Sequence, residues 1–364
     1  MNDQNEALLD AITGILPPLL NAMETLGMAG RHLHPPTLGE LIAQLGEFDA
    51  PVVDALKGFG AVPWPEHLLG FKQRVEAACD AVCQGAEGLR AAADKPDGVF
   101  QAYRALRFHT RAFEAMYPLA ATLPPISQFY LEAAVRDDAD LLAKLAAVKP
   151  DKEDVGVMHV DNDKGTRGGF SLYVPEYYDS DQSYPVVMAM HGGTGHGRYF
   201  LWTWLREARS RGAIVISPTS RGDTWALMGP DIDSENIEAM LERVAERWNV
   251  DRSRLLLTGM SDGGTFSYVS GLRASSPFTH LAPLSAAFHP MILQAAEDER
   301  IKGLPVYLTH GALDWMFPVD IAQTADKALR EAGAEVVYRE IADLSHTYPR
   351  EENAPIMDWF LDGA

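Results

Sequence analysis

The stretch Leu255-Leu256-Leu257-Thr258-Gly259-Met260-Ser261-Asp262-Gly263-Gly264 is the most informative part of this chain. An apolar run, typical of a buried strand, ends at two glycines that flank Ser261 at a spacing of two, and a helical pattern follows. In the G-x-S-x-G pattern, a sharp strand-to-helix turn pushes the serine hydroxyl out into a cleft. Such a turn leaves no room for Cβ atoms on either side of the serine, so glycines are expected there. We therefore predict that Ser261 is a nucleophile.

The chain on both sides of this stretch, over residues 151–364, alternates short β-rich runs with amphipathic helical patterns. Continuous apolar strands separated by helices indicate a mostly parallel sheet with helices on both faces, which is an α/β fold. The predicted strands are Phe170–Val174, Val186–Met190, Ala213–Ser217, Leu255–Thr258, His280–Leu284, Val306–Thr309 and Val336–Ile341.

Residues 1–150 have a different character, because apolar residues recur there at helical spacing and β-branched runs are scarce. One pattern joins Phe71 to Leu89, a second joins Val99 to Tyr117, and a third helix is predicted from Ile126 to Val148. The polar stretch that starts at Lys149 predicts a boundary. We expect an all-α N-terminal domain over residues 1–150 and an α/β domain over residues 151–364.

A serine hydroxyl is a weak nucleophile until a base takes its proton, and a third group must orient that base. The predicted strand Val306–Thr309 leads into Asp314, and the strand Val336–Ile341 leads into His346. Both residues follow strand ends, where active sites of parallel sheets form. We predict Asp314 as the orienting acid and His346 as the base, with Asp320 and Asp343 as alternative acids.

A glycine-rich loop follows the strand Val186–Met190 and reads His191-Gly192-Gly193-Thr194-Gly195-His196-Gly197. Backbone N–H groups in such a loop can stabilise the oxyanion of a tetrahedral intermediate. We predict the amides of Gly193 and Asp262 as donors, with Thr194 as an alternative to Gly193. His191 is expected to hold the loop in place.

Aromatic residues are frequent around these loops, and a site that binds an acyl group needs apolar walls. Trp315 and Phe317 directly follow Asp314, and Trp225 precedes the elbow by one predicted helix. We expect at least one of these three side chains to line the substrate pocket.

These motifs together resemble the serine esterases of the α/β-hydrolase superfamily, around its phospholipase/carboxylesterase and polyhydroxybutyrate depolymerase/feruloyl esterase-like branches. The resemblance rests on the order of five motifs over about residues 165–364: Tyr173-Val174-Pro175-Glu176, His191-Gly192-Gly193, Gly259 to Gly264, His310-Gly311-Ala312-Leu313-Asp314, and His346. It implies an α/β-hydrolase fold and hydrolysis of carboxylic esters through an acyl-enzyme, without a metal or an organic cofactor. Residues 1–150 match no family that we recognise.

The net charge of the chain limits the classes of partner that it is expected to bind. The formal net charge is −20; residues 1–150 hold 12 basic and 19 acidic residues, and residues 151–364 hold 19 and 32. Both parts are acidic, which argues against nucleic acid as a partner. No stretch is apolar enough to span a membrane. The N-terminal residues lack the basic and apolar regions of a signal peptide, so a cytoplasmic protein is expected.

The function hypothesis is a serine carboxylesterase that acts on small-molecule esters with short to medium acyl chains. A thioesterase or a serine peptidase would use the same three residues, and a non-catalytic binding protein on a hydrolase scaffold is the alternative from a different class. Three roles are open for the N-terminal helices: a cap over the cleft, an oligomerisation surface and a partner-binding module. We favour a cap that also contributes to homo-oligomer assembly.

Overall fold

The structure is a computed structural model that describes residues 3–93, 95–149, 152–294, 296 and 298–362. By its internal contacts the chain divides into two compact units, Met1–Tyr130 (unit 1) and Leu131–Ala364 (unit 2). The boundary predicted from the sequence, between residues 150 and 151, lies outside the described residues. Each unit is described by itself.

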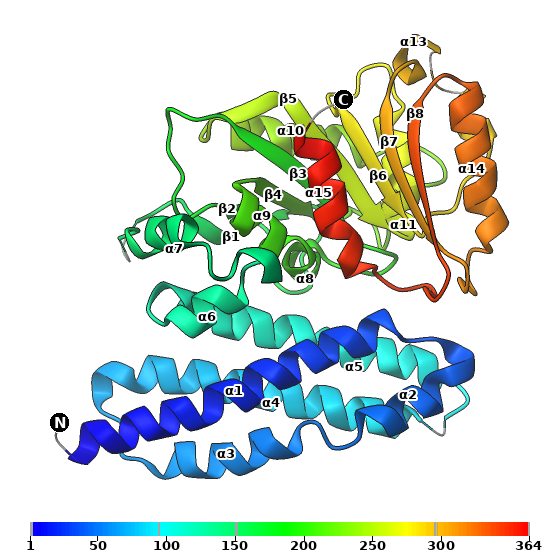
Figure 1. Cartoon of the computed structure of the whole chain (residues 1–364). Coiled ribbons are helices and arrows are strands. Elements are labelled where there is room, and N and C mark those ends of the chain that lie inside the picture. The colour runs from blue at the N-terminus through cyan, green and yellow to red at the C-terminus, as the bar shows by residue number, and fades with distance from the viewer. Residues whose placement is uncertain (1–2, 94, 150–151, 295, 297, 363–364) are drawn as a thin grey trace. The chain divides into compact units, whose positions relative to one another are not determined.

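Unit 1 is built from helices (Figure 1). Its central pair, α4 and α5, packs closely, since a Cβ added to Gly88 of α4 would lie 2.7 Å from Cβ of Ala105 in α5. The residues of α4 from Val75 to Leu89 that follow the predicted helical spacing are buried. The helices are α1 (Asp3–Arg31), α2 (Leu38–Leu45), α3 (Ala50–Ala61), α4 (Leu69–Ala92), α5 (Gly98–Met116) and α6 (Pro124–Phe129), with 3₁₀ turns η1 (Pro35–Thr37), η2 (Glu66–Leu68) and η3 (Tyr117–Ala121).

Unit 2 contains an eight-stranded sheet in the order β1-β2-β4-β3-β5-β6-β7-β8. At one end of the sheet, β2 pairs antiparallel with both β1 and β4. From β4 through β3, β5, β6 and β7 to β8, all pairs are parallel. The mostly parallel sheet predicted from the sequence is therefore confirmed. The strands are β1 (Gly156–Val160), β2 (Phe170–Val174), β3 (Tyr184–Met190), β4 (Ile214–Pro218), β5 (Val250–Met260), β6 (His280–Leu284), β7 (Pro305–Gly311) and β8 (Glu335–Ile341).

Helices lie on both faces of this sheet, with α15 in front of it and α11 behind it in Figure 1. The apolar sides of α10, α11 and α14 pack against alternate residues of the strands in one hydrophobic core. The helices of unit 2 are α7 (Ala139–Ala146), α8 (Gly197–Phe200), α9 (Leu205–Arg211), α10 (Ser234–Ala245), α11 (Asp262–Gly271), α12 (Met291–Gln294), α13 (Asp298–Ile301), α14 (Val319–Glu331) and α15 (Asn353–Asp362), with 3₁₀ turns η4 (Ala133–Val135), η5 (Leu201–Thr203) and η6 (Arg350–Glu352).

The helix predicted from Ile126 to Val148 is wrong. The chain there forms α6, η4 and α7 in succession, because α6 ends at Phe129 and a new helix begins after Asp138. The carboxylate of Asp138 accepts hydrogen bonds from the amides of Asp140 and Leu141, both at 3.0 Å, and so caps α7.

Within the described residues, no helix has the length and apolar character needed to cross a membrane.

Candidate active site

Ser261 lies at the turn between β5, which ends at Met260, and α11, which begins at Asp262. Its backbone has φ 56° and ψ −119°, a left-handed conformation that costs a non-glycine residue about 1–3 kcal/mol. Hydrogen bonds hold this conformation: the Ser261 amide donates to Leu284 O at 2.9 Å, and Ser261 O accepts from the Thr265 amide at 2.8 Å. The predicted strand–turn–helix context of Ser261 is confirmed.

The two glycines of the turn are required by their neighbours. A Cβ on Gly259 would lie 2.6 Å from backbone atoms of Gly263. A Cβ on Gly263 would lie 2.4 Å from Met190 O and 2.5 Å from His191 O. Any side chain at either position would push the end of β5 or the start of α11 away from β3, as the sequence pattern predicts.

His346 and Asp314 lie beside Ser261, although 85 residues separate the serine from the histidine. His346 Nε2 is 2.9 Å from Ser261 Oγ, and His346 Nδ1 is 2.8 Å from Asp314 Oδ2. Both side chains are buried, whereas the Ser261 residue is partly exposed. The structure thus brings together the serine, the histidine and the first of the three candidate acids in one line of hydrogen bonds.

Asp314 is fixed in the loop after β7 by that loop's own backbone. Asp314 Oδ1 accepts from the amides of Met316 at 2.9 Å and Phe317 at 2.8 Å, which leaves Oδ2 for His346. His310 Nε2 lies 2.8 Å from Phe317 O and 3.5 Å from Asp314 Oδ2, and burial lowers the pKa of this histidine. A neutral His310 therefore ties the strand end to the loop.

The alternative acid Asp320 lies in the first turn of α14, where a carboxylate suits the helix dipole.

The glycine-rich loop after β3 packs directly on the serine turn. A Cβ on Gly192 would lie 3.5 Å from Ser261 Cβ, and one on Gly193 would lie 2.8 Å from Asp262 Oδ2. In the part of the chain that the structure describes, neither the Gly193 amide nor the Asp262 amide donates to an acceptor. Both predicted donors are therefore available near Ser261. Thr194, the alternative donor, sits at φ 54° in the same turn.

His191 holds this loop in place through the hydrogen bonds of its ring. Its Nε2 accepts from the Ser220 amide at 3.1 Å, so the proton of a neutral ring is on Nδ1, which lies 2.6 Å from Gly192 O. Burial lowers the pKa of His191 to about 3, which keeps the ring neutral.

The three predicted pocket residues occupy different environments. Trp225 is 3% exposed, stacks on Phe266 at 5.1 Å between ring centroids, and donates its indole N–H to His191 O at 2.7 Å. This placement argues against contact between Trp225 and a substrate. Trp315 is 38% exposed, and the Phe317 ring meets the His346 ring edge-on at 5.2 Å. Of the three, Phe317 is the side chain with a ring contact to the hydrogen-bonded line.

Several polar residues around the site carried no signal in the sequence. Thr224 donates its hydroxyl proton to Asp262 Oδ2 at 2.5 Å, although no motif marks Thr224. Arg167, in the loop between β1 and β2, donates to Gly195 O of the glycine-rich loop at 2.7 Å. Neither could have been found by spacing, because both reach the site from loops with no characteristic pattern.

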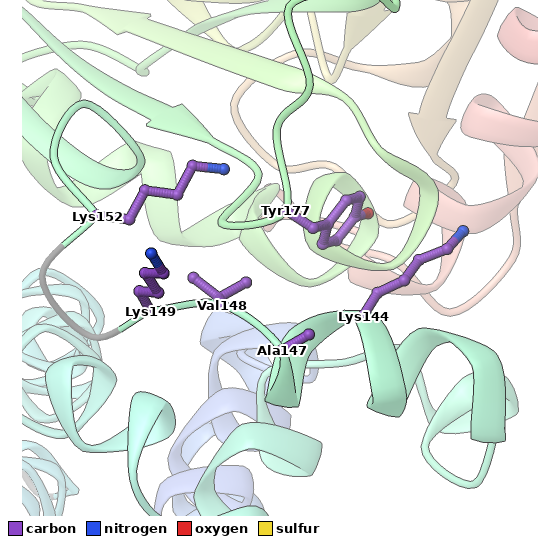
Figure 2. A pocket seen from close by; sticks show the side chains of 6 residues that line it. All are labelled: Lys144, Ala147, Val148, Lys149, Lys152 and Tyr177. Atoms are coloured by element: carbon purple, nitrogen blue, oxygen red, sulfur yellow. The ribbon is translucent and has the colours of Figure 1, made fainter.

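A separate cavity of about 500 Å³ lies elsewhere in unit 2, and Figure 2 shows the side chains around it. None of the predicted site residues lines this cavity; its walls are Lys144, Ala147, Val148, Lys149, Lys152 and Tyr177. Among the described residues, no group of three or more His, Cys, Asp or Glu side chains is placed to hold a metal ion.

Residues 231–360 match the family model of the phospholipase/carboxylesterase proteins. The matched segment contains the serine turn, Asp314 and His346, on the mostly parallel sheet described above. Unit 2 has the α/β-hydrolase fold. Its glycine-rich loop after β3 lies outside the matched residues.

Curated relatives of this chain are named as esterases. The chain is 25% identical over 183 residues to a bifunctional acetylxylan esterase/xylanase of Neocallimastix patriciarum, covering 48% of this chain and 26% of the relative. It is 26% identical over 176 residues to a probable feruloyl esterase C of Aspergillus terreus, covering 46% of this chain and 62% of the relative. The chain therefore spans less than two thirds of the length of either relative. A solved structure of a thermostable esterase is also similar, with a TM-score of 0.47 at 20% identity over 57% of this chain and 62% of that one.

Proposed function

We propose that the chain is a serine carboxylesterase that hydrolyses esters with short to medium acyl chains through an acyl-enzyme on Ser261. The observation that carries this proposal is the line of hydrogen bonds from Asp314 Oδ2 through the His346 ring to Ser261 Oγ, at 2.8 and 2.9 Å. A serine, a base and an orienting acid at these distances form the arrangement that activates a serine hydroxyl.

The proposed reaction gives a role to each residue of this hydrogen-bonded line. His346 Nδ1–H donates to Asp314, which leaves Nε2 as the acceptor for the Ser261 hydroxyl proton. Ser261 Oγ attacks the ester carbonyl carbon as His346 takes that proton, and His346 then gives it to the leaving alcohol oxygen. In the second half-reaction water attacks the acyl-enzyme as His346 takes one of its protons, and His346 gives that proton to Ser261 Oγ as the carboxylic acid is released.

The Gly193 and Asp262 amides are proposed as the oxyanion donors in both half-reactions. They are not engaged by acceptors in the described part of the chain, and they belong to the two segments that touch at Ser261. Losing one such donor typically reduces kcat by about 10²–10³-fold. Trp315 and Phe317 are proposed to line the acyl-binding side of the site, because they lie next to Asp314 and His346.

The names of the relatives and the matched family support ester bonds as the substrate class. The role of residues 1–150 as a cap and in homo-oligomer assembly remains a proposal. Two measurements on the full chain and on a chain lacking residues 1–130 separate these roles: light scattering for the mass, and p-nitrophenyl ester hydrolysis for the acyl-length preference. Assembly predicts a lower oligomer mass in the shorter chain, and a cap predicts a changed acyl-length preference.

The proposed chemistry is tested with p-nitrophenyl esters from acetate to decanoate. The wild-type chain is expected to show an optimum at one acyl length, and Ser261→Ala should lower kcat by several orders of magnitude. Ser267→Ala is the matched control, since Ser267 lies on the same helix α11 and its hydroxyl donates to Gly264 O at 2.6 Å.

A fluorophosphonate probe provides a second readout that does not depend on the choice of ester. The probe should add its mass to the wild-type chain and to Ser267→Ala, but not to Ser261→Ala. A wild-type chain that neither hydrolyses any ester nor reacts with the probe would refute the proposal in favour of a binding protein. A labelled chain that cleaves only thioesters or peptides would replace the ester by one of those substrates.

A further inference from the structure

Arg167 is a half-buried arginine that bonds to backbone carbonyls instead of carboxylates. Its Nε donates to Ser220 O at 3.0 Å and to Gly222 O at 2.9 Å, and its Nη1 donates to Gly195 O at 2.7 Å. Its Nη2 donates to the Ser220 hydroxyl and, at 3.2 Å, to Asp223 O. Within the described residues Arg167 forms no ion pair. One guanidinium thus joins the loop after β4 to the glycine-rich loop after β3.

The first route from Arg167 to the proposed oxyanion donor passes through Ser220. Arg167 binds both the carbonyl and the hydroxyl of Ser220, and the Ser220 amide donates to His191 Nε2 at 3.1 Å. That bond places the ring proton on His191 Nδ1, which lies 2.6 Å from Gly192 O. Gly192 O belongs to the same peptide group as the Gly193 N–H.

The second route passes through Gly195. The Gly195 amide donates to Gly192 O at 3.0 Å, so the residues from Gly192 to Gly195 form a tight turn. Arg167 holds the far end of this turn by its bond to Gly195 O. Gly192 O therefore accepts two hydrogen bonds, and both depend on groups that Arg167 fixes.

Hydrogen bonds accepted by a peptide carbonyl polarise that peptide and strengthen its N–H as a donor. The same bonds fix the direction in which the N–H points, and a displacement of about 1 Å in a reacting group can cost about 10²-fold in rate. Both effects act on the oxyanion, which exists only in the transition state and the intermediate.

We propose that Arg167 is a positioning residue for the oxyanion hole, acting on the Gly193 N–H through Ser220 and His191 on one side and through Gly195 on the other. This inference rests on the proposed esterase function and names a residue outside the three hydrogen-bonded side chains. Arg167 does not touch the substrate.

The test compares Arg167→Met with Arg300→Met in the full chain. Arg300 is a matched control because it too donates to backbone carbonyls, Gly271 O at 2.9 and 2.7 Å and Phe278 O at 2.7 Å, away from the site. For Arg167→Met we expect kcat for a p-nitrophenyl ester to fall about 10²-fold with KM within about threefold of wild type. For Arg300→Met we expect kcat within about twofold of wild type, whatever the change in unfolding temperature.

An alkyl trifluoromethyl ketone gives a readout that a general loss of stability would not move. A serine oxygen adds to the carbonyl carbon of this ketone, and the ketone oxygen becomes a tetrahedral oxyanion. The affinity of the inhibitor should therefore fall in Arg167→Met by the same factor as kcat. Arg167→Lys, which keeps the charge and some donors, should lose about tenfold in kcat and serves as the readout if the methionine variant does not fold.

The outcomes separate this inference from the function on which it rests. An active wild-type chain in which Arg167→Met or Arg167→Lys keeps wild-type kcat and inhibitor affinity would overturn the positioning role alone. Equal losses of kcat in Arg167→Met and Arg300→Met would also overturn it. A wild-type chain without hydrolysis or fluorophosphonate labelling would overturn both proposals.

Discussion

Replacing Gly263 by alanine should damage stability and catalysis together. The added Cβ would lie 2.4 Å from Met190 O and 2.5 Å from His191 O, whereas an ordinary contact needs at least 3.4 Å. Both obstacles are backbone atoms at the start of the glycine-rich loop, so they cannot rotate away. The loop and the helix α11 must separate by roughly 1 Å, which typically costs about 1–3 kcal/mol as overpacking and about 10²-fold in rate.

The assay measures unfolding in urea and kcat for a p-nitrophenyl ester on the same preparations. Gly271→Ala, at the other end of α11, is the matched control. Its Cβ would lie 2.3 Å from Cδ2 of Leu281, a side-chain atom, so it should lower the free energy of unfolding while kcat stays within about twofold. A Gly263→Ala chain that is destabilised but retains wild-type kcat would show that the loop does not need this close approach.

Three further predictions concern the acid, a buried histidine and an ion pair. Asp314→Asn should lower kcat about 10⁴-fold because the His346 tautomer is lost, whereas Asp320→Asn should stay within about twofold of wild type; the reverse result would move the acid to Asp320. Burial lowers the pKa of His280 from 6.5 to about 4. Because the unfolded chain binds this proton first as the pH falls, the free energy of unfolding should drop by about 3 kcal/mol from pH 6.5 to 4 through this residue. Urea titrations of His280→Asn should lack that part of the drop, and parallel pH curves for the variant and the wild type would contradict it. Arg211→Met removes the arginine that binds the partly buried Glu132 carboxylate at 2.6 and 2.9 Å, and should cost about 3 kcal/mol in urea unfolding; a loss below 1 kcal/mol would show that water replaces the pair.

The sequence predicts the strands β2, β3, β4, β6 and β7 well because these are short apolar runs with both faces buried. The predicted strands Phe170–Val174 and His280–Leu284 agree with β2 and β6 at both ends. The strand β1 was not predicted, because four of its five residues are only partly buried and its pattern lacks a continuous apolar run. Edge strands depend on pairing with a neighbour, here β2, which local sequence does not encode.

The positions of Ser261, Asp314 and His346 could be predicted because the carboxyl ends of neighbouring parallel strands meet at one edge of a sheet. What could not be predicted is which side chains support them. Arg167, Ser220 and Thr224 reach the site from irregular loops, where no hydrophobic period fixes the direction of a side chain. The single helix expected from Ile126 to Val148 failed for a local reason, since Asp138 starts a new helix by capping α7.

Ser261 precedes His346 by 85 positions, and this order matters while the chain is being synthesised. The serine turn contacts β3 and α11 and bonds to the Leu284 carbonyl, and all of these segments are synthesised before His346. His346 follows β8, the last strand of the sheet and one of its two edges. Until His346 is in place the proposed base is missing, and the Ser261 hydroxyl is a weak nucleophile. On the proposed mechanism, Ser261 is therefore activated only once β8 has paired with β7 and the sheet is complete.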